Sequence, residues 1–310
     1  MRHGRLFRRG PLAVVVLVAA ATTALAVPAA RAAPAVRAGY GPTVTLSGHG
    51  FGHGIGMSQV GAYGYATHFG WSWEQILAHY YGGTTLGATD PNQTFSVRLT
   101  ANDDTPVTAV IEDAGLAGSS ANGFAAGYGS LAAVEFAAGH YRVYGLGAVN
   151  CPAATTTAEF EAPGSPWAIV AADVPSADFA VLGGIDSSIA PVASLLGLCE
   201  PAGTDQFDGT IHARYYRGTI RALNGSAGEN RTVNILPLDR YVQGVVPREM
   251  PASWGGDSGG AGLNALRAQA VAARSYGVSQ GRYSYAKTCD TQSCQVYGGA
   301  GFRAAVNPED

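Results

Sequence analysis

Residues 236–254 read LPLDRYVQGVVPREMPASW, and a glycine-rich link joins them to residues 263–280, LNALRAQAVAARSYGVSQ. The apolar residues of the first stretch recur on one side of a helix, which predicts a short amphipathic helix. They are Leu238, Tyr241, Val242, Val245 and Val246. Pro247 disfavours a helical conformation for the residue before it, so we expect this helix to end at Val246. The second stretch carries two stripes of small and apolar residues, which predict a longer helix that packs closely on two sides.

An acidic residue, Glu249, follows the first predicted helix and lies between two prolines. Because each proline fixes its own φ angle, the tripeptide between them should be held stiffly. Met250 and Trp254 lie near Glu249 in sequence and offer apolar surroundings. The stretch therefore predicts one acid in an apolar pocket. The alternative is that Glu249 only caps a helix or pairs with Arg248 or Arg274.

The composition is that of a loop-rich globular protein. Of the 310 residues, 47% are hydrophobic, 13% are charged and 43 are glycine. This length suffices for one large or two modest domains with real cores, and the composition lacks the charge excess of a disordered chain. Lys287 is the only lysine, and no stripe of basic residues occurs, so nucleic-acid binding has no support.

Residues 1–32 have the three parts of a secretory signal peptide. Arginines precede an apolar core at residues 12–27, and Ala30-Arg31-Ala32 forms a cleavage site of the A-x-A type. Two threonines interrupt the apolar core, which disfavours the alternative of a retained membrane anchor. We therefore expect a secreted, extracytoplasmic protein. Cleavage removes five arginines and lowers the formal net charge from −3 to −8.

Four cysteines fit an oxidising compartment. The pairing of Cys151 with Cys199 and of Cys289 with Cys294 is one of three possible connectivities, and the sequence leaves all three open. A metal site is the alternative for the second pair. Export, and the lack of a histidine between Cys289 and Cys294, favour a local disulfide there.

Residues 43–56 read TVTLSGHGFGHGIG, with glycines at strict alternation from position 48 onward. If this segment is extended, one face is bare backbone that a ligand or a neighbouring chain can approach closely. His49 and His53 share the other face. A zinc site would need a third ligand, and the alternatives are an imidazole that contacts substrate or one that is packed in the fold.

Two helices are predicted after this segment. One covers residues 58–69, where Gly61 and Gly64 would serve close packing. The other begins after Ser72, which has Gln75 three residues later in the pattern of a capping box, and it ends before a pair of glycines.

Residues 94–235 read as β-structure, because short runs rich in β-branched and aromatic residues alternate with Gly, Asn and Asp turns. These runs are residues 95–101, 107–112, 141–144, 167–171, 179–182, 211–216 and 219–223. Residues 114–129 and 183–202 are rich in Gly, Ala and Ser, so we expect loops or small insertions there.

Three motifs resemble the hallmarks of the SpoIID/LytB family of bacterial cell-wall proteins. YVQGVVPREMPASW with LNALRAQAVAARSY is similar to the first hallmark, GHGIGMSQVGA at residues 52–62 to the second, and CDTQSCQVY within residues 287–299 to the third. In most members the second motif closes the domain at its C-terminus. Here it precedes Glu249, an order similar to that of actinobacterial members.

The resemblance implies an α+β fold: a mixed, β-rich body with a few packed helices around a central cleft. The expected organisation is a signal peptide at 1–32, a glycine-rich strand and helix segment at 33–93, a β-rich portion at 94–235, and the catalytic-motif segment at 236–310. Relatives continue with further strands, so we expect this last segment to be truncated at its C-terminus.

The resemblance also implies a function. Family members of the SpoIID type are lytic transglycosylases that cleave the glycan strands of peptidoglycan, and their catalytic glutamate falls on Glu249. One carboxylic acid suffices if it protonates the glycosidic oxygen and then deprotonates the sugar's own C6 hydroxyl, which leaves a 1,6-anhydro end. Such an acid needs a raised pKa near neutral pH. No metal or other cofactor is implied. The alternative is a non-catalytic, LytB-like wall-binding modifier that stimulates an amidase.

The motifs place the expected substrate contacts, which are His53, Ser58, Gln59, Arg248, Met250, Trp254, Arg267 and Arg274. Neither motif forms a site alone, because one supplies the acid and the other the approachable backbone. We therefore predict that residues 52–62 and 247–254 line one cleft, with the side chains of Glu249 and His53 within about 12 Å. Four aromatic residues would stack on sugars or, more commonly, pack in the core. They are Trp71, Trp73, Tyr80 and Tyr81.

Overall fold

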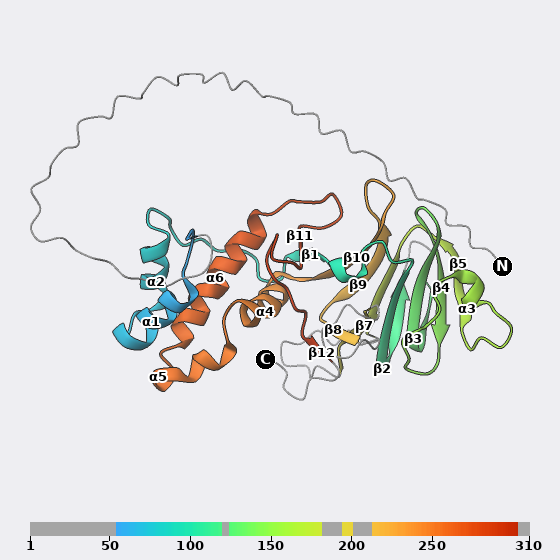
Figure 1. Ribbon diagram of the computed structural model, residues 1–310, viewed down its shortest axis with the longest axis horizontal. Helices are drawn as coiled ribbons and strands as arrows, with labels where there is room; N and C mark the ends of the chain where they lie inside the picture. The colour runs from blue at the N-terminus through green and yellow to red at the C-terminus, as the bar shows by residue number, and fades with distance from the viewer. Residues whose placement is uncertain (1–53, 120–123, 182–193, 201–212, 303–310) are drawn as a thin grey trace, which may run out of the picture. The chain divides into compact units, whose positions relative to one another are not determined.

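The computed structural model describes residues 54–119, 124–181, 194–200 and 213–302 (Figure 1). The predicted signal peptide, His49 and His53 lie outside these residues. Within the described ranges, no helix is both long enough and apolar enough to cross a membrane.

Twelve strands of the described chain form one hydrogen-bonded network. They are β1 (Thr94–Arg98), β2 (Val107–Ser119), β3 (Phe124–Ala137), β4 (His140–Leu146), β5 (Ala168–Val174), β6 (Ala177–Val181), β7 (Leu196–Cys199), β8 (Ala213–Tyr216), β9 (Thr219–Asn224), β10 (Asn230–Pro237), β11 (Thr288–Cys289) and β12 (Gly301–Phe302). The main path runs β11-β1-β10-β9-β6-β2-β3-β4-β5, while β7 pairs with β2 and β8, and β12 pairs with β8. Only β1 and β11 run parallel among these pairs.

The helices are α1 (Gln59–Phe69), α2 (Trp73–Tyr80), α3 (Thr157–Phe160), α4 (Leu238–Glu249), α5 (Asp257–Gly260) and α6 (Leu263–Ser279), with 3-10 turns at Thr100–Asn102 and Ala252–Gly256. The long helix α6 packs against α1, α2 and α4 (Figure 1). This mixture of a large sheet and packed helices confirms the α+β class. The two helices predicted from residues 58–81 are present, and Ser72 and Gln75 form the expected capping box at the start of α2.

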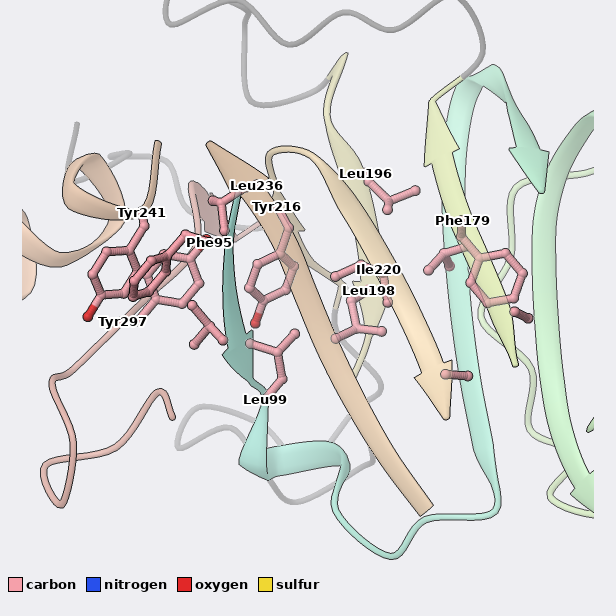
Figure 2. Packing of buried hydrophobic residues seen from close by; sticks show 14 of the residues in the cluster. Phe95, Leu99, Phe179, Leu196, Leu198, Tyr216, Ile220, Leu236, Tyr241 and Tyr297 are labelled. Carbon is pink, nitrogen blue, oxygen red and sulfur yellow. The ribbon is translucent and has the colours of Figure 1, made fainter. Parts of the chain in front are cut away.

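The main hydrophobic core joins α4 to the sheet (Figure 2). The ring of Tyr241 on α4 lies 4.3 Å from that of Phe95 on β1 and 5.5 Å from that of Tyr297. Leu236 and Leu238, at the junction of β10 and α4, are buried in the same core. Burial of each large apolar side chain contributes about 1.5–3 kcal/mol. These contacts therefore fix α4 against β1 and the end of β10.

A second core holds α1, α2 and α6 together. Its fully buried alanines come from α1 and α6, and they are Ala62, Ala66, Ala265 and Ala268. These small side chains allow the close packing that the stripes of the longer helix predict. Gly61 also serves close packing, because a β-carbon there would collide with the hydroxyl of Tyr80. The same prediction is wrong for Gly64, where a β-carbon would meet no atom within 4 Å.

Helix α4 ends three residues later than the sequence predicts. It runs through Pro247 to Glu249, so the predicted end at Val246 is wrong, and Glu249 lies in a helical last turn instead of a rigid turn between prolines. A proline removes one helical hydrogen bond. The buried apolar face of α4 outweighs that loss. The backbone N–H of Met250 then closes the helix on the carbonyl of Val246.

All seven predicted β runs contain a strand, but the loops predicted at residues 114–129 and 183–202 are wrong in part. The strand β2 continues to Ser119, β3 begins at Phe124, and β7 lies at Leu196–Cys199. Gly and Ala have weak β propensity, so these strands owe their conformation to pairing with their neighbours. In β2, Val110 and Ile111 pair with β7, whereas Leu116–Ser119 pair with β6.

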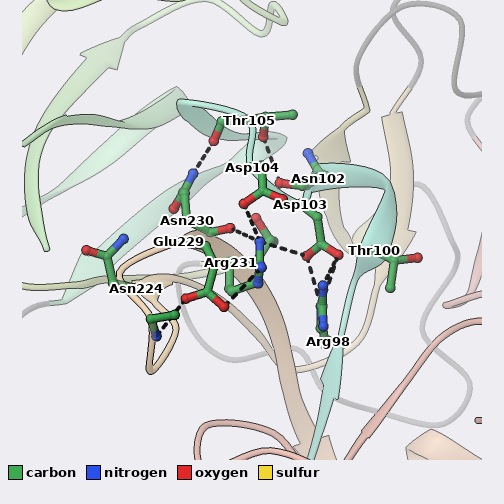
Figure 3. Close-up of polar contacts among 12 residues, drawn as sticks. Arg98, Thr100, Asn102, Asp103, Asp104, Thr105, Asn224, Glu229, Asn230 and Arg231 are labelled. Carbon is green, nitrogen blue, oxygen red and sulfur yellow. Dashed lines mark hydrogen bonds and ion pairs between the residues drawn. The ribbon is translucent and has the colours of Figure 1, made fainter. Parts of the chain in front are cut away.

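The sequence also gives no signal for β10, which is rich in polar residues yet buried between β1 and β9. Its Arg231 is 6% exposed and forms ion pairs with Asp104 at 2.6 Å and Glu229 at 3.2 Å (Figure 3). Asn234 donates to the carbonyls of Arg217 and Thr219. Buried polar groups are tolerated when they are paired in this way.

The structure selects one connectivity from the three, in which Cys151 is bonded to Cys199 and Cys289 to Cys294. The bond between Cys151 and Cys199 ties β7 to the segment that follows β4. The bond between Cys289 and Cys294 closes a short loop after β11 and confirms the local disulfide. In the part of the chain that the structure describes, no three His, Cys, Asp or Glu residues are grouped so that they could hold a metal ion.

Candidate active site

A cleft of about 520 Å³ lies where α1, α4 and α6 meet the loop after β11. Its walls come from five parts of the chain: Ile55, Gly56, Met57 and Gln59; Tyr81; Arg248 and Glu249; Gln269, Ala272, Ala273 and Tyr276; and Gln292, Cys294, Gln295 and Val296. Four of these residues carry neutral amides. Glu249 is the single carboxylate among the described residues that line the cleft.

Glu249 is the last residue of α4, and its side chain is half-buried. The Nε2 of Gln59 donates a hydrogen bond of 2.9 Å to Glu249 Oε2, and the backbone N–H of Val296 donates to the same carboxylate. Burial raises the pKa of the Glu249 carboxyl above its usual value, and these two hydrogen bonds oppose that rise because they favour the charged form. The C-terminal end of a helix also disfavours negative charge. The site therefore holds Glu249 closer to its protonated state than an exposed glutamate.

The structure brings the two distant motifs together. Ile55, Met57 and Gln59 belong to the segment at residues 52–62, and they line the same cleft as Glu249. The hydrogen bond from Gln59 to Glu249 joins residues 190 positions apart. His53 lies outside the described residues, so its distance from Glu249 stays a prediction.

Arg248 also lines the cleft, next to Glu249 on the last turn of α4. Its guanidinium lies directly over Gly298, where a β-carbon would come within 2.7 Å of Arg248 Cζ. The glycine is needed there because any side chain would displace the guanidinium. Arg248 is the one cationic side chain among the described cleft residues.

Five other predicted substrate contacts lie outside the set of residues that line the cleft. Ser58 caps α1 by accepting a hydrogen bond from the backbone N–H of Gly61. Met250 is 1% exposed in the helical core, and Arg267 points to solvent from α6. Arg274 forms an ion pair with Asp239, so the alternative in which it pairs with Glu249 finds no support.

Trp254, the fifth of these residues, belongs to an aromatic pair beside the cleft. Its ring lies 4.5 Å from that of Tyr63 on α1. The hydroxyl of Tyr63 donates a 2.8 Å hydrogen bond to Asp257. Asp257 thereby has its own partner and does not line the cleft with Glu249.

The four aromatic residues at positions 71–81 differ in their surroundings, and stacking on sugars stays a prediction. Trp71, Trp73 and Tyr80 pack against the helical core. Tyr81 lines the cleft as well, and its hydroxyl accepts a 3.2 Å hydrogen bond from the backbone N–H of Met57. This bond helps to hold the segment before α1 at the cleft wall.

Sequence reasoning missed several cleft residues. Tyr276 on α6 is 37% exposed at the cleft, and Gln269 is 8% exposed on the same helix. Gln295 accepts a 2.8 Å hydrogen bond from the hydroxyl of Tyr241. Gln269 gave a signal, because it interrupts a stripe of alanines on a helix predicted to be packed on two sides. The amides of the loop after β11 gave none, because the fold alone places them.

Comparison with known proteins supports a cell-wall-related role for this chain. Residues 226–308 match the family model described as "Stage II sporulation protein" (SpoIID). A protein named amidase enhancer, from Bacillus subtilis (strain 168), is 41% identical over 66 residues, which are 21% of this chain and 8% of that protein. Stage II sporulation protein D of Bacillus amyloliquefaciens is 46% identical over 50 residues, or 16% of this chain and 14% of that protein. No solved structure matches the chain.

These matches show a SpoIID domain at residues 226–308, and they support a cell-wall-related role. The matched segments span less than a sixth of each relative, so they do not assign a particular reaction.

Proposed function

We propose that this protein is a peptidoglycan lytic transglycosylase with Glu249 as its general acid and base. The observation that carries the proposal is Glu249 itself, the single carboxyl among the described residues that line the cleft, which is half-buried and has a raised pKa. Hydrolytic glycosidases use two carboxyl groups, one of which positions or replaces the attacking water. A cleft with one carboxyl suits the reaction in which the sugar supplies its own nucleophile.

In the first step the protonated Glu249 donates its proton to the glycosidic oxygen, and the bond between that oxygen and C1 breaks. The carboxylate that remains then takes the proton of the C6 hydroxyl, and O6 forms a bond with C1. The product is a 1,6-anhydro sugar, no water is consumed, and Glu249 returns to its protonated state. Burial raises the pKa of the Glu249 carboxyl, so at any given pH more of it is protonated and able to make the first proton transfer.

The other groups of the cleft suit the binding of a glycan. Amides such as Gln269 and Gln295 both donate and accept hydrogen bonds, as hydroxyl and acetamido groups require. The exposed ring of Tyr276 offers an apolar face for a sugar ring. Arg248 can hold an anionic group of the strand. The predicted signal peptide fits a secreted, wall-associated enzyme.

A second candidate follows from the similarity to the protein named amidase enhancer. In that function the cleft would bind the wall and the protein would stimulate a separate amidase, with no chemical role for Glu249. The transglycosylase requires the Glu249 carboxyl and the amidase enhancer does not, so the variant Glu249→Gln separates the two functions.

The deciding experiment incubates the purified protein with purified glycan strands, with and without stem peptides, and identifies the products by mass spectrometry. We expect 1,6-anhydro ends from the wild type. Glu249→Gln should lower turnover by about 10²–10⁴-fold, because it removes the acid and base. Its binding to cell-wall sacculi should be unchanged, since the substitution is nearly isosteric.

Asp257→Asn is the matched control, because it removes a carboxylate that lies outside the cleft. It should retain the anhydro products. Ordinary reducing ends that depend on Asp257 would instead identify a hydrolase. Amidase stimulation that persists in Glu249→Gln, with no glycan cleavage by the wild type, would establish the enhancer function.

A further inference from the structure

Gln59 contacts Glu249, the one carboxylate that lines the cleft in the described part of the chain, and the position of Gln59 is set independently of that contact. It is the first residue of α1, whose N-terminus Ser58 caps. Two residues before Gln59, the backbone N–H of Met57 donates a hydrogen bond to the hydroxyl of Tyr81. The helix itself is packed on α6 through buried alanines. The scaffold therefore presents the Gln59 amide to Glu249 at 2.9 Å.

The partner of Glu249 is neutral, which matters for a group that must change its charge twice in one cycle. An arginine or lysine at this place would hold Glu249 charged, and a second carboxylate would compete with it for one proton. An amide N–H donates to the carboxylate at every pH. It stabilises the charge that remains after the first proton transfer without preventing reprotonation.

Among the described residues, few other titratable groups lie around Glu249. From α4 they are Arg248 and Tyr241, from α6 Tyr276, and from the end of α2 Tyr81. The remaining polar side chains that line the cleft from α6 and from the loop after β11 are neutral amides. The hydrogen bonds from Gln59 and from the backbone of Val296 are thus the main contacts that favour the charged form.

We propose that Gln59 is a positioning residue, which holds Oε2 of Glu249 so that Oε1 carries the transferred proton towards the glycan. The catalytic part of this inference rests on the proposed function, whereas the hydrogen bond between Gln59 and Glu249 does not. It assigns two tasks to the amide: it orients the carboxyl, and it keeps the carboxylate form accessible for the second step. Arg248 and the other amides of the cleft then serve to bind substrate.

The test compares Gln59→Leu with the wild type by ¹³C NMR titration of the Glu249 side-chain carboxyl, assigned with Glu249→Gln. Loss of one hydrogen bond to the charged form should raise the pKa of Glu249 by about one unit. Gln59→Glu, which is nearly isosteric, should raise it further and give two coupled titration steps, because two carboxylates would share one proton. Circular dichroism checks that each variant is folded, and either variant alone suffices for the test.

Kinetics supply the second readout. With glycan strands as substrate, Gln59→Leu should lower kcat by about tenfold with little change in KM, because the lost bond stabilises charge that develops in the transition state. The alkaline limb of its pH–rate profile should move upward with the pKa of Glu249. Gln243→Leu makes the same chemical change at an exposed position of α4 away from the cleft, and it should alter neither quantity.

An unchanged Glu249 titration in both folded variants would overturn the inference. So would an unchanged kcat and pH profile beside a wild type that cleaves glycans. If the wild type forms no anhydro product while the titration moves as expected, the proposed function fails, and the positioning contact stands by itself.

Discussion

Gly244 lies within α4, on the side that faces the loop at residues 297–299. A β-carbon at this position would overlap the ring of Tyr297, with Cδ2 at 2.9 Å, and would lie 2.8 Å from the carbonyl oxygen of Gly299. Tyr297 is 4% exposed and its hydroxyl is bonded to Asn234, so the ring has no free space to enter. Gly244→Ala therefore tests how closely α4 and this loop are packed.

Two effects of this substitution oppose each other. Replacing glycine by alanine inside a helix stabilises it by about 1 kcal/mol through propensity. Overpacking of a filled core costs about 1–3 kcal/mol, and the collision here involves backbone and a fixed ring, so we place it at the upper end. We expect Gly244→Ala to lower the free energy of unfolding by about 1–2 kcal/mol.

Gly64→Ala is the matched control, because it makes the same change inside α1 where no atom lies within 4 Å of the new methyl group. It should raise the free energy of unfolding by about 0.5–1 kcal/mol. Urea denaturation measures both values, with an unchanged m-value showing that stability alone has altered. If Gly244→Ala stabilises the protein as Gly64→Ala does, the reasoning from close packing is refuted.

Two further predictions concern pH and the disulfides. Burial raises the pKa of Glu249 in the folded protein, so wild-type stability should fall as the pH increases from the unfolded pKa, about 4.5, through the folded pKa. Glu249→Gln should therefore gain stability relative to the wild type over this pH window. Parallel thermal melts from pH 4 to 8 check this, and a difference in stability that stays constant with pH would contradict it. Substituting serine for Cys151 and Cys199, whose bond closes a span of 48 residues, should cost about 4 kcal/mol of stability. Serine at Cys289 and Cys294, with a span of 5, should cost less stability. This second variant should however lower kcat, because the disulfide loop leads to the backbone N–H of Val296, which is bonded to Glu249. Equal effects of both pairs on kcat would refute this distinction.

The sequence predicts the parts of this fold that depend on local pattern. The small-residue stripe of α6, the capping box at Ser72 and the approach of residues 55–59 to Glu249 all follow from spacing or resemblance. The strands β3, β7 and β10 do not, because their Gly, Ala and polar residues become strands only through pairing and burial among neighbours distant in sequence. Pro247 shows the same limit, since tertiary packing of α4 overrides a local helix-ending signal.

The candidate site follows the same division. Glu249 and Gln59 are accessible to sequence reasoning because each lies in a recognisable motif. The cleft residue Gln295 is not, because its place depends on the disulfide loop that brings it beside α4. The predicted contact Met250 lies in the same motif as Glu249, but it follows the last residue of α4 with an extended backbone, and its side chain is buried in the helical core. A motif thus locates a segment, whereas the direction of each side chain depends on the local backbone conformation.

The two groups at the centre of the site, the Gln59 amide and the Glu249 carboxylate, lie at a helix N-terminus and a helix C-terminus respectively. Gln59 begins α1 and Glu249 ends α4, and each of these helices packs on α6. The distance between the amide and the carboxylate is therefore set by α6 acting as a spacer, and not by the chain that connects them. The order of the two helices along the chain affects the connections between them and not these helix contacts. The role of α6 as a spacer also means that its alanines bear on activity. A larger side chain at Ala265 or Ala268 would move α1 away from α4 and lengthen the bond to Glu249 before it unfolded the protein.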